Sequence, residues 1–142
     1  MKITHIISSL ESNQGGPPNA VLNMAEQQGK LGNKVNIISQ FKNLKYKKKI
    51  KLKGIKIIRG EFLFKKHYIP NFNFIFKIYK ILKDTDIVHL HGVWNGVISI
   101  SLLLCRFMKK KTVLTPHGSL DYFNIKNRFY FKKFYYYLFE KY

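Results

Sequence analysis

The sequence has very little cysteine and no long hydrophobic run. Its single cysteine, Cys105, lies inside an apolar segment, which excludes a disulfide framework and suits a reducing compartment. The longest apolar stretch, Val97 to Cys105, is interrupted by serines and is well short of the roughly 20 residues that a membrane-spanning helix needs. The first residues lead into a strand-like segment with no small-residue cleavage site. We therefore expect neither a secretory signal nor an integral membrane protein.

Acidic residues are also scarce. Seven Asp and Glu stand against 26 Lys and Arg, a formal charge of +19, which predicts an anionic partner such as nucleic acid or an acidic membrane surface. Only Arg59, Arg106 and Arg128 are arginine, the side chain most used for bidentate base contacts, and no nucleic-acid motif is recognisable. A basic nucleic-acid-binding module remains the alternative function. Strong, steeply salt-dependent DNA retention in a filter-binding assay would favour it.

The 142 residues suit a single domain, and a content of 46% hydrophobic and 15% aromatic residues predicts a real core. Short β-branched runs alternate with segments of helical periodicity, which predicts parallel strands joined by right-handed helical crossovers, hence an α/β fold. The expected strands are Lys2 to Ser8, Val35 to Ser39, Ile55 to Arg59, Asp86 to His91 and Thr112 to Thr115. The expected helices are Asn19 to about Gly32, Phe72 to Lys83 after an Asn71 cap, Gly96 to Met108, and Ile125 to Tyr142; the lysine-rich stretch from Lys42 to Lys56 is expected to be mainly a solvated loop or hairpin.

Three loops carry candidate binding residues, and each follows a predicted strand. They are Gly15 to Pro18, His91 to Asn95, and Pro116 to Ser119. Paired glycines allow a ligand to approach the backbone, and a helix N-terminus favours anions. If the strands are parallel, the loops leave one edge of the sheet, where ligands bind in open α/β folds. The competing interpretations are an ordinary glycine turn, and a His117 that only bonds its local backbone and leaves no cleft.

Two further histidines suggest a metal site at first sight. Alternation along a strand places His89 and His91 on one face. The nearby acids, Asp84 and Asp86, fall on the opposite face, and no cysteine is close in sequence. Because no ligand set is complete, we expect no metal.

The order and spacing of these motifs resemble the amino-terminal half of a family 4 glycosyltransferase, an enzyme with the two-domain GT-B fold. The residues that carry the resemblance are Lys2 to Ser9, Gly15-Gly16-Pro17, Asp86 to Trp94 (Asp-Ile-Val-His-Leu-His-Gly-Val-Trp) and Thr115 to Asp121 (Thr-Pro-His-Gly-Ser-Leu-Asp). The resemblance implies a Rossmann-like open parallel sheet with helices on both faces. It also implies retaining transfer of a sugar from a nucleotide-sugar donor to a cell-surface polysaccharide or lipid-linked acceptor, without a metal or other cofactor.

The resemblance also implies roles for individual residues. His117 is expected to reach the donor sugar near its reacting carbon and to act as the catalytic residue. The glycine loop is expected to approach the donor phosphates, and the loop after His91 to face the acceptor. The expected donor- and acceptor-binding residues are Gly15, Gly16, His91, Trp94, Asn95, Gly118 and Ser119.

In the family a second Rossmann-like domain follows, which holds the nucleotide and a pair of glutamates. We expect residues 1–142 to form the amino-terminal domain alone, without that carboxyl-terminal domain and inactive by itself. A fragment, one piece of a split enzyme and a decayed gene product all fit this expectation. We also expect a peripheral position at the cytoplasmic face of the membrane, with anionic lipid bound by one basic aromatic surface made of Lys77, Lys80, Lys83 and the Ile125 to Tyr142 helix.

Overall fold

The computed structural model of the chain describes residues 1–11, 15–40, 54–64, 68–126, 129–137 and 141. Its strands are β1 (Lys2–Ser9), β2 (Lys34–Gln40), β3 (Ile55–Arg59), β4 (Phe62–Phe64), β5 (Ile69–Pro70), β6 (Ile87–His91) and β7 (Lys111–Thr115). Its helices are α1 (Gly16–Lys30), α2 (Phe72–Lys83), α3 (Gly96–Phe107), α4 (Tyr122–Lys126) and α5 (Phe129–Tyr135). All five predicted strands are present. Most of the predicted lysine-rich loop, residues 42–53, lies outside the described residues.

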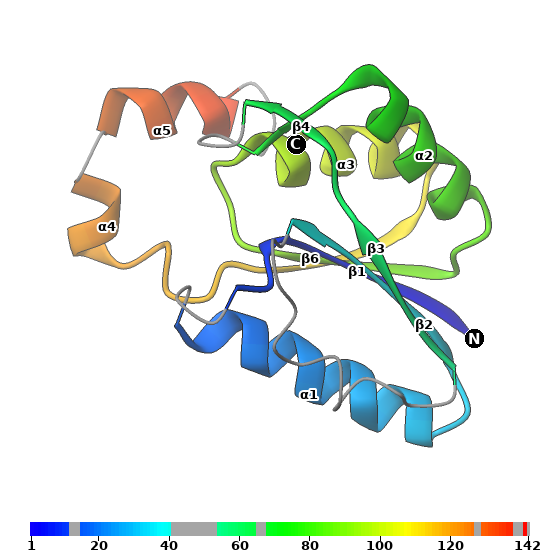
Figure 1. Cartoon of the computed structure of the whole chain (residues 1–142). Helices are drawn as coiled ribbons and strands as arrows, with labels where there is room; N and C mark the ends of the chain where they lie inside the picture. Colours follow the sequence, from blue (N-terminus) through cyan, green and yellow to red (C-terminus); the bar gives the residue numbers. More distant parts are fainter. Residues whose placement is uncertain (12–14, 41–53, 65–67, 127–128, 138–140, 142) are drawn as a thin grey trace.

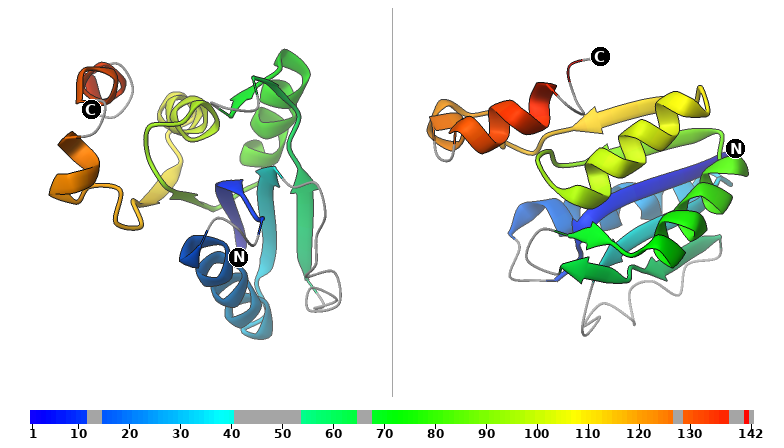
Figure 2. Two further views of the ribbon diagram at one scale, coloured as in Figure 1. Left: turned by 60° about the vertical axis from the view of Figure 1, so that its left-hand side comes forward. Right: turned by 90° about the horizontal axis from the view of Figure 1, so that it is seen from above.

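The centre of the molecule is a five-stranded sheet in the order β3-β2-β1-β6-β7, with every neighbouring pair parallel. Helix α1 covers one face, and α2 and α3 cover the other (Figures 1 and 2). Strands β4 and β5 form a small antiparallel hairpin beside the main sheet, which the sequence did not predict. The predicted α/β architecture, a Rossmann-like open parallel sheet with helices on both faces, is confirmed.

Each face of the sheet has its own apolar core because neighbouring residues of a strand point to opposite sides. The α1 face contains six buried apolar residues: Ile7, Leu10, Val21, Ala25, Val35 and Ile37. The other face packs Ile6, Ile38, Val88 and Leu90 against buried residues of α2 and α3. The α2 residues Phe74, Ile78 and Leu82 recur every four positions, so one stripe of that helix is buried.

Two helices begin where the sequence predicts, and one begins earlier. The side chain of Asn71 accepts a hydrogen bond of 2.8 Å from the Phe74 backbone N–H at the start of α2, which confirms the predicted cap. Helix α3 begins at Gly96 as expected. Helix α1 begins at Gly16 rather than Asn19, because proline fits the first turn, where its missing N–H costs nothing.

The prediction of one helix from Ile125 to Tyr142 is wrong. The structure has two short helices, α4 and α5, on either side of residues 127–128, and α4 already begins at Tyr122. Helix α4 follows directly on the turn after β7, where the Ile125 backbone N–H bonds the Asp121 carbonyl. No glycine or proline separates the two helices, so the sequence carried no signal for the break.

Membrane-crossing helices are not found in the described part of the chain. Every helix there is too short or too polar to span a bilayer. Helix α3, which contains the apolar stretch Val97 to Cys105, has 12 residues.

Candidate functional site

The strand order creates a crevice at the carboxyl ends of β1 and β6. From β1 the chain continues to β2 on one side, whereas β6 pairs with β1 on the other side. Such a reversal separates the loops that follow the two strands, and ligands of open α/β sheets bind there. Ile7, His91 and Thr115 are aligned across β1, β6 and β7, so the three strands end close together. The prediction that the three loops leave the same edge is confirmed.

A cavity of about 170 Å³ lies at this edge and is lined by all three loops. Four of the predicted site residues line it: His91, Asn95, His117 and Ser119. Pro17 and Pro18 form the side contributed by the glycine loop, next to Gly15 and Gly16. The competing interpretation, in which His117 bonds only its local backbone and leaves no cleft, does not agree with this cavity.

Trp94, another predicted site residue, does not line this cavity. It lines a neighbouring, largely apolar pocket of about 370 Å³ between the loop after β6 and helices α4 and α5. The Lys132 ammonium lies 4.4 Å from the centre of the Trp94 ring, in a cation–π contact. Trp94 therefore lines a second pocket, separate from the cavity that His91 and His117 line.

The loop after β7 holds His117 in an unusual backbone conformation. The Ser119 N–H bonds the Pro116 carbonyl at 3.1 Å, closing a turn whose central residues, His117 and Gly118, have φ of 50° and 76°. Two positive φ values are typical of a type I′ turn, which favours Asn-Gly. A histidine in the left-handed region costs about 1 kcal/mol or more, and such strain is concentrated at functional sites. Gly118 thus allows the turn to form, and the turn places His117 in the wall of the cavity.

The loop after β6 combines a second strained residue with a helix cap. Trp94 has φ of 57°. Asn95 accepts a hydrogen bond of 3.1 Å from the Ile98 N–H and caps α3. Its side-chain nitrogen lies 3.4 Å from the Val93 carbonyl. Asn95 therefore fixes the loop, and its oxygen is already engaged by the helix.

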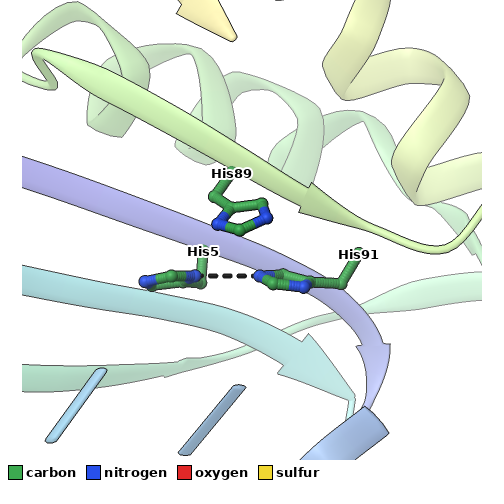
Figure 3. A group of neighbouring side chains, drawn as sticks. All are labelled: His5, His89 and His91. Atoms are coloured by element: carbon green, nitrogen blue, oxygen red, sulfur yellow. Dashed lines mark hydrogen bonds between the residues drawn. The ribbon is translucent and has the colours of Figure 1, made fainter. Parts of the chain in front are cut away.

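The structure adds two residues that the sequence did not single out, His5 and Gln28. Four side chains form one continuous row of hydrogen bonds, which we call the histidine row: Gln28, His5, His91 and His117. The Gln28 Oε1 lies 2.7 Å from His5 Nε2, His5 Nδ1 lies 2.9 Å from His91 Nε2, and His91 Nδ1 lies 2.9 Å from His117 Nε2. Figure 3 shows the rings of His5 and His91 edge to edge. His5 and His91 are 0% and 2% exposed, so water does not compete for these bonds.

His89 lies over the row and does not extend it. Its ring stacks on His91 with 4.0 Å between centroids and 27° between planes (Figure 3), and its Nε2 lies 2.8 Å from Thr115 Oγ1. Nitrogen lone pairs lie in the ring plane, so stacked rings do not direct them at one point. His5 Nδ1 and His91 Nε2 already face each other at hydrogen-bond distance. Among the described residues, the cluster of His5, His89 and His91 therefore fits a hydrogen-bonded stack better than a tetrahedral metal site.

Burial keeps these rings neutral. Desolvation lowers the pKa of His5, although its bond to Gln28 acts in the opposite direction. Desolvation, with repulsion from His5 and His117, lowers the pKa of His89 to about 4. The pKa of His91 is lowered to about 2, mainly by desolvation and then by the three other histidines. Burial also lowers the pKa of His117. At neutral pH each ring therefore offers one donor and one acceptor.

These shifts predict acid sensitivity. The folded pKa values lie below the unfolded value near 6.5, so the unfolded chain binds more protons, and stability falls as the pH drops below about 6.5. Each ring that stays neutral in the fold should lower the free energy of unfolding by about 1.4 kcal/mol per pH unit in that range. Urea denaturation between pH 7 and 4.5 measures the slope.

The variant His91→Gln provides the control for that slope. It should start less stable, because the row is interrupted, but lose stability less steeply on acidification. An unfolding free energy that stays constant from pH 6.5 to 4.5 in the unmodified chain would contradict the prediction.

Comparisons with solved structures agree with this fold. MurG from Acinetobacter baumannii superposes with a TM-score of 0.56 at 16% identity, over 80% of this chain and 34% of that one. A Listeria monocytogenes protein described as a UDP-N-acetylglucosamine 2-epimerase superposes with a TM-score of 0.52 at 17% identity, over 93% of this chain and 34% of that one. At these identities the likenesses show the fold alone, that of a Rossmann-like domain of the kind found in GT-B proteins. This chain spans about a third of the length of either structure.

Sequence comparison gives the narrower result. No curated protein matches the chain significantly. The family model for Glycosyltransferase Family 4 matches residues 14–142. This range includes the three loops of the crevice but not β1. The resemblance found in the sequence motifs is thereby confirmed: the chain belongs to glycosyltransferase family 4.

Proposed function

We propose that this chain is the acceptor-side half of a retaining glycosyltransferase, which moves a sugar from a nucleotide-sugar to a lipid-linked or cell-surface polysaccharide acceptor. The observation that carries the proposal is the cavity at the carboxyl ends of β1, β6 and β7, with His117 and His91 in its wall. Family membership supports the reaction class. The chain supplies this wall of the active site, and a second domain supplies the nucleotide-binding wall.

His117 is the proposed catalytic residue. A sugar leaving its nucleotide develops positive charge at the reacting carbon, and a protonated ring nearby would oppose that charge. The lowered pKa of His117 keeps the ring neutral, so it can bond a sugar hydroxyl without adding charge. A hydrogen bond from the His117 ring to the buried His91 fixes the orientation of the His117 ring. Ser119 adds a hydroxyl to the same cavity.

The glycine loop is the proposed contact for the donor phosphates. Gly15 has φ of 77°, a conformation that suits glycine, and no side chain caps the N-terminus of α1. A Cβ at Gly15 or Gly16 would meet nothing within 4 Å, so the backbone borders open space. Pro17 and Pro18 lack an N–H, so the amides of Gly15 and Gly16 are the donors that this turn can offer an anion.

The apolar pocket beside Trp94 is the proposed place for the lipid part of the acceptor. Its wall combines Trp94, Leu120 and Phe129 with Lys132 and Lys133. An apolar floor edged by two cations is complementary to a hydrocarbon chain that ends in a phosphate.

A transfer assay tests the proposed reaction. The chain, combined with the nucleotide-binding half of its enzyme, is incubated with lipid extract and radiolabelled UDP-, GDP- or ADP-sugars. We expect label in the lipid or polysaccharide fraction with one of these donors, and the product's anomeric configuration to match that of the donor. Release of free sugar alone, or inversion of configuration, would contradict the proposal.

Membrane attachment at the cytoplasmic face is a further part of the proposal, with one change of geometry. The sequence placed Lys77, Lys80 and Lys83 on one surface with the C-terminal aromatic segment. In the structure α2 and α5 lie on the same side of the sheet but with α3 between them (Figures 1 and 2), so they form two surfaces. One of these surfaces, which we call the α2 surface, consists of five exposed side chains of α2: Phe72, Phe76, Lys77, Lys80 and Lys83.

We expect the α2 surface to bind anionic vesicles. Lysines near an anionic membrane contribute roughly 1 kcal/mol each, and exposed phenylalanines add apolar contact. In liposome flotation the chain should float with anionic and not with neutral vesicles. The double variant Lys77→Gln/Lys80→Gln should weaken flotation. Lys30→Gln/Lys34→Gln removes the same charge from α1 and the start of β2, and should have little effect. Equal flotation with both vesicle types would contradict the expectation.

A further inference from the structure

The histidine row connects the α1 helix to the catalytic loop across two strands. Gln28 is on α1, His5 on β1, His91 at the end of β6, and His117 in the turn after β7. Each of its three bonds joins a different pair of ring or amide atoms, and no ring atom is used twice. We propose that Gln28 is a positioning residue that selects, through His5 and His91, the tautomer in which His117 meets its substrate.

The direction of the row follows from the chemistry of imidazole. A neutral ring has one N–H and one bare nitrogen, so a ring that donates on one side must accept on the other. Gln28 presents Oε1, which can only accept, so His5 must carry its proton on Nε2. His5 Nδ1 is then bare and accepts from His91 Nε2–H. His91 Nδ1 is bare in turn and accepts from His117 Nε2–H.

All three rings therefore share one tautomer, with the proton on Nε2. The opposite row, with every proton on Nδ1, requires Gln28 to turn its amide nitrogen toward His5. No mixed row is possible, because a mixed row would set two protons or two lone pairs against each other across a 2.9 Å gap. The orientation of a single amide, partly exposed on α1, is thus coupled to the tautomer of a ring three hydrogen bonds away.

The consequence for His117 is that its Nδ1 carries a lone pair. Such a nitrogen accepts a hydrogen bond from a sugar hydroxyl and cannot donate one. This step rests on the proposed function, since it is the sugar that makes the lone pair useful. His89 is not part of the selection, because its Nε2 bonds Thr115 rather than a ring of the row.

Nitrogen NMR of the histidine rings tests the inference without any need for activity. The chain has five histidines, so single His→Gln variants suffice to assign the ring signals of ¹⁵N-histidine-labelled protein. At pH 7.5 we expect His5, His91 and His117 each to show a protonated Nε2 and a bare Nδ1. Different tautomers among the three rings, or charged rings, would overturn the inference.

Gln28→Met removes the amide and keeps the length and helix propensity of the side chain. We expect it to abolish the single tautomer, so that His91 and His117 show signals from both forms. Gln27→Met makes the same change at the neighbouring, exposed position and should leave the ring signals unaltered. Gln28→Glu, which can only accept, should restore the Nε2–H form at His91 and His117 above the pH at which His5 takes up a second proton. Unchanged His117 signals in Gln28→Met would overturn the inference.

The two proposals fail separately. If the tautomers respond to Gln28 as expected, the inference stands, whatever the transfer assay gives. A complete absence of sugar transfer by the assembled enzyme would instead contradict the proposed function. In an active enzyme, Gln28→Met should lower kcat more than it raises KM, because it changes the state of the ring and not the shape of the cavity.

Discussion

His117→Asn should lower the turnover of the assembled glycosyltransferase by a factor of about 100 or more while the domain stays folded. Removing one hydrogen-bonding group that acts on developing charge costs about 10²- to 10³-fold in other enzymes. Asparagine suits the left-handed conformation that His117 occupies, so the turn should form at least as readily as before. The loss should therefore appear in kcat, as measured with saturating donor.

Two companion measurements separate chemistry from folding. His117→Ala should show a similar loss of turnover, together with a small loss of stability from alanine in the same backbone conformation. The free energy of unfolding of both variants should fall by no more than about 1–3 kcal/mol, the cost of leaving the buried Nδ1 of His91 without its partner. Near-normal turnover in either variant would remove His117 from the mechanism.

Phe74→Ala should destabilise the domain by about 3–5 kcal/mol, a large part of the 5–15 kcal/mol typical of a domain. Phe74 is 1% exposed and packs between α2 and the sheet. Its ring meets Phe62 edge to face, with 5.6 Å between centroids. Removing it leaves a cavity that the surrounding strands and helices cannot fill without moving.

Phe72→Ala is the matched control for this prediction. It makes the same substitution two residues earlier on the same helix, where the side chain is 84% exposed. We expect a change within about 0.5 kcal/mol, as is usual for surface positions. Urea denaturation of the two variants side by side measures the difference. Equal stabilities would mean that α2 does not pack against the sheet as described. Phe72→Ala should, however, weaken vesicle binding if the α2 surface meets the membrane.

The sequence was sufficient to predict the sheet and the meeting of the three loops at one edge of it. Every strand of the main sheet is a short β-branched run, and Pro116 ends β7 directly after Thr115, as expected of a residue that cannot donate to a ladder. Three parallel strands then bring their loops together by geometry alone. The C-terminal segment was not predictable in the same way, because its apolar residues recur at helical spacing throughout and no glycine or proline marks the end of a helix within it.

The histidine row was not predictable from local patterns. His89 and His91 attract notice because they are two residues apart, whereas His5 is 86 residues from His91. The only signal for His5 is its register: it pairs with His89 across β1 and β6, so all three rings lie on the α1 face. Gln28 lies on α1 at the boundary between its exposed and buried faces. Glutamine is common at such positions, so its presence in the sequence does not predict a role in the row.

The long separation along the chain between the members of the row has a consequence for how the protein matures. Strand β1, helix α1 and strand β2 are local neighbours and can associate while the ribosome is still making the rest. At that stage His5 has Gln28 as its partner and His91 does not yet exist. The ring that completes the row arrives only with His117, after β6 and β7 have closed loops of much greater length. The edge proposed to bind the sugar is therefore complete only after β7 and the turn that follows it have been made.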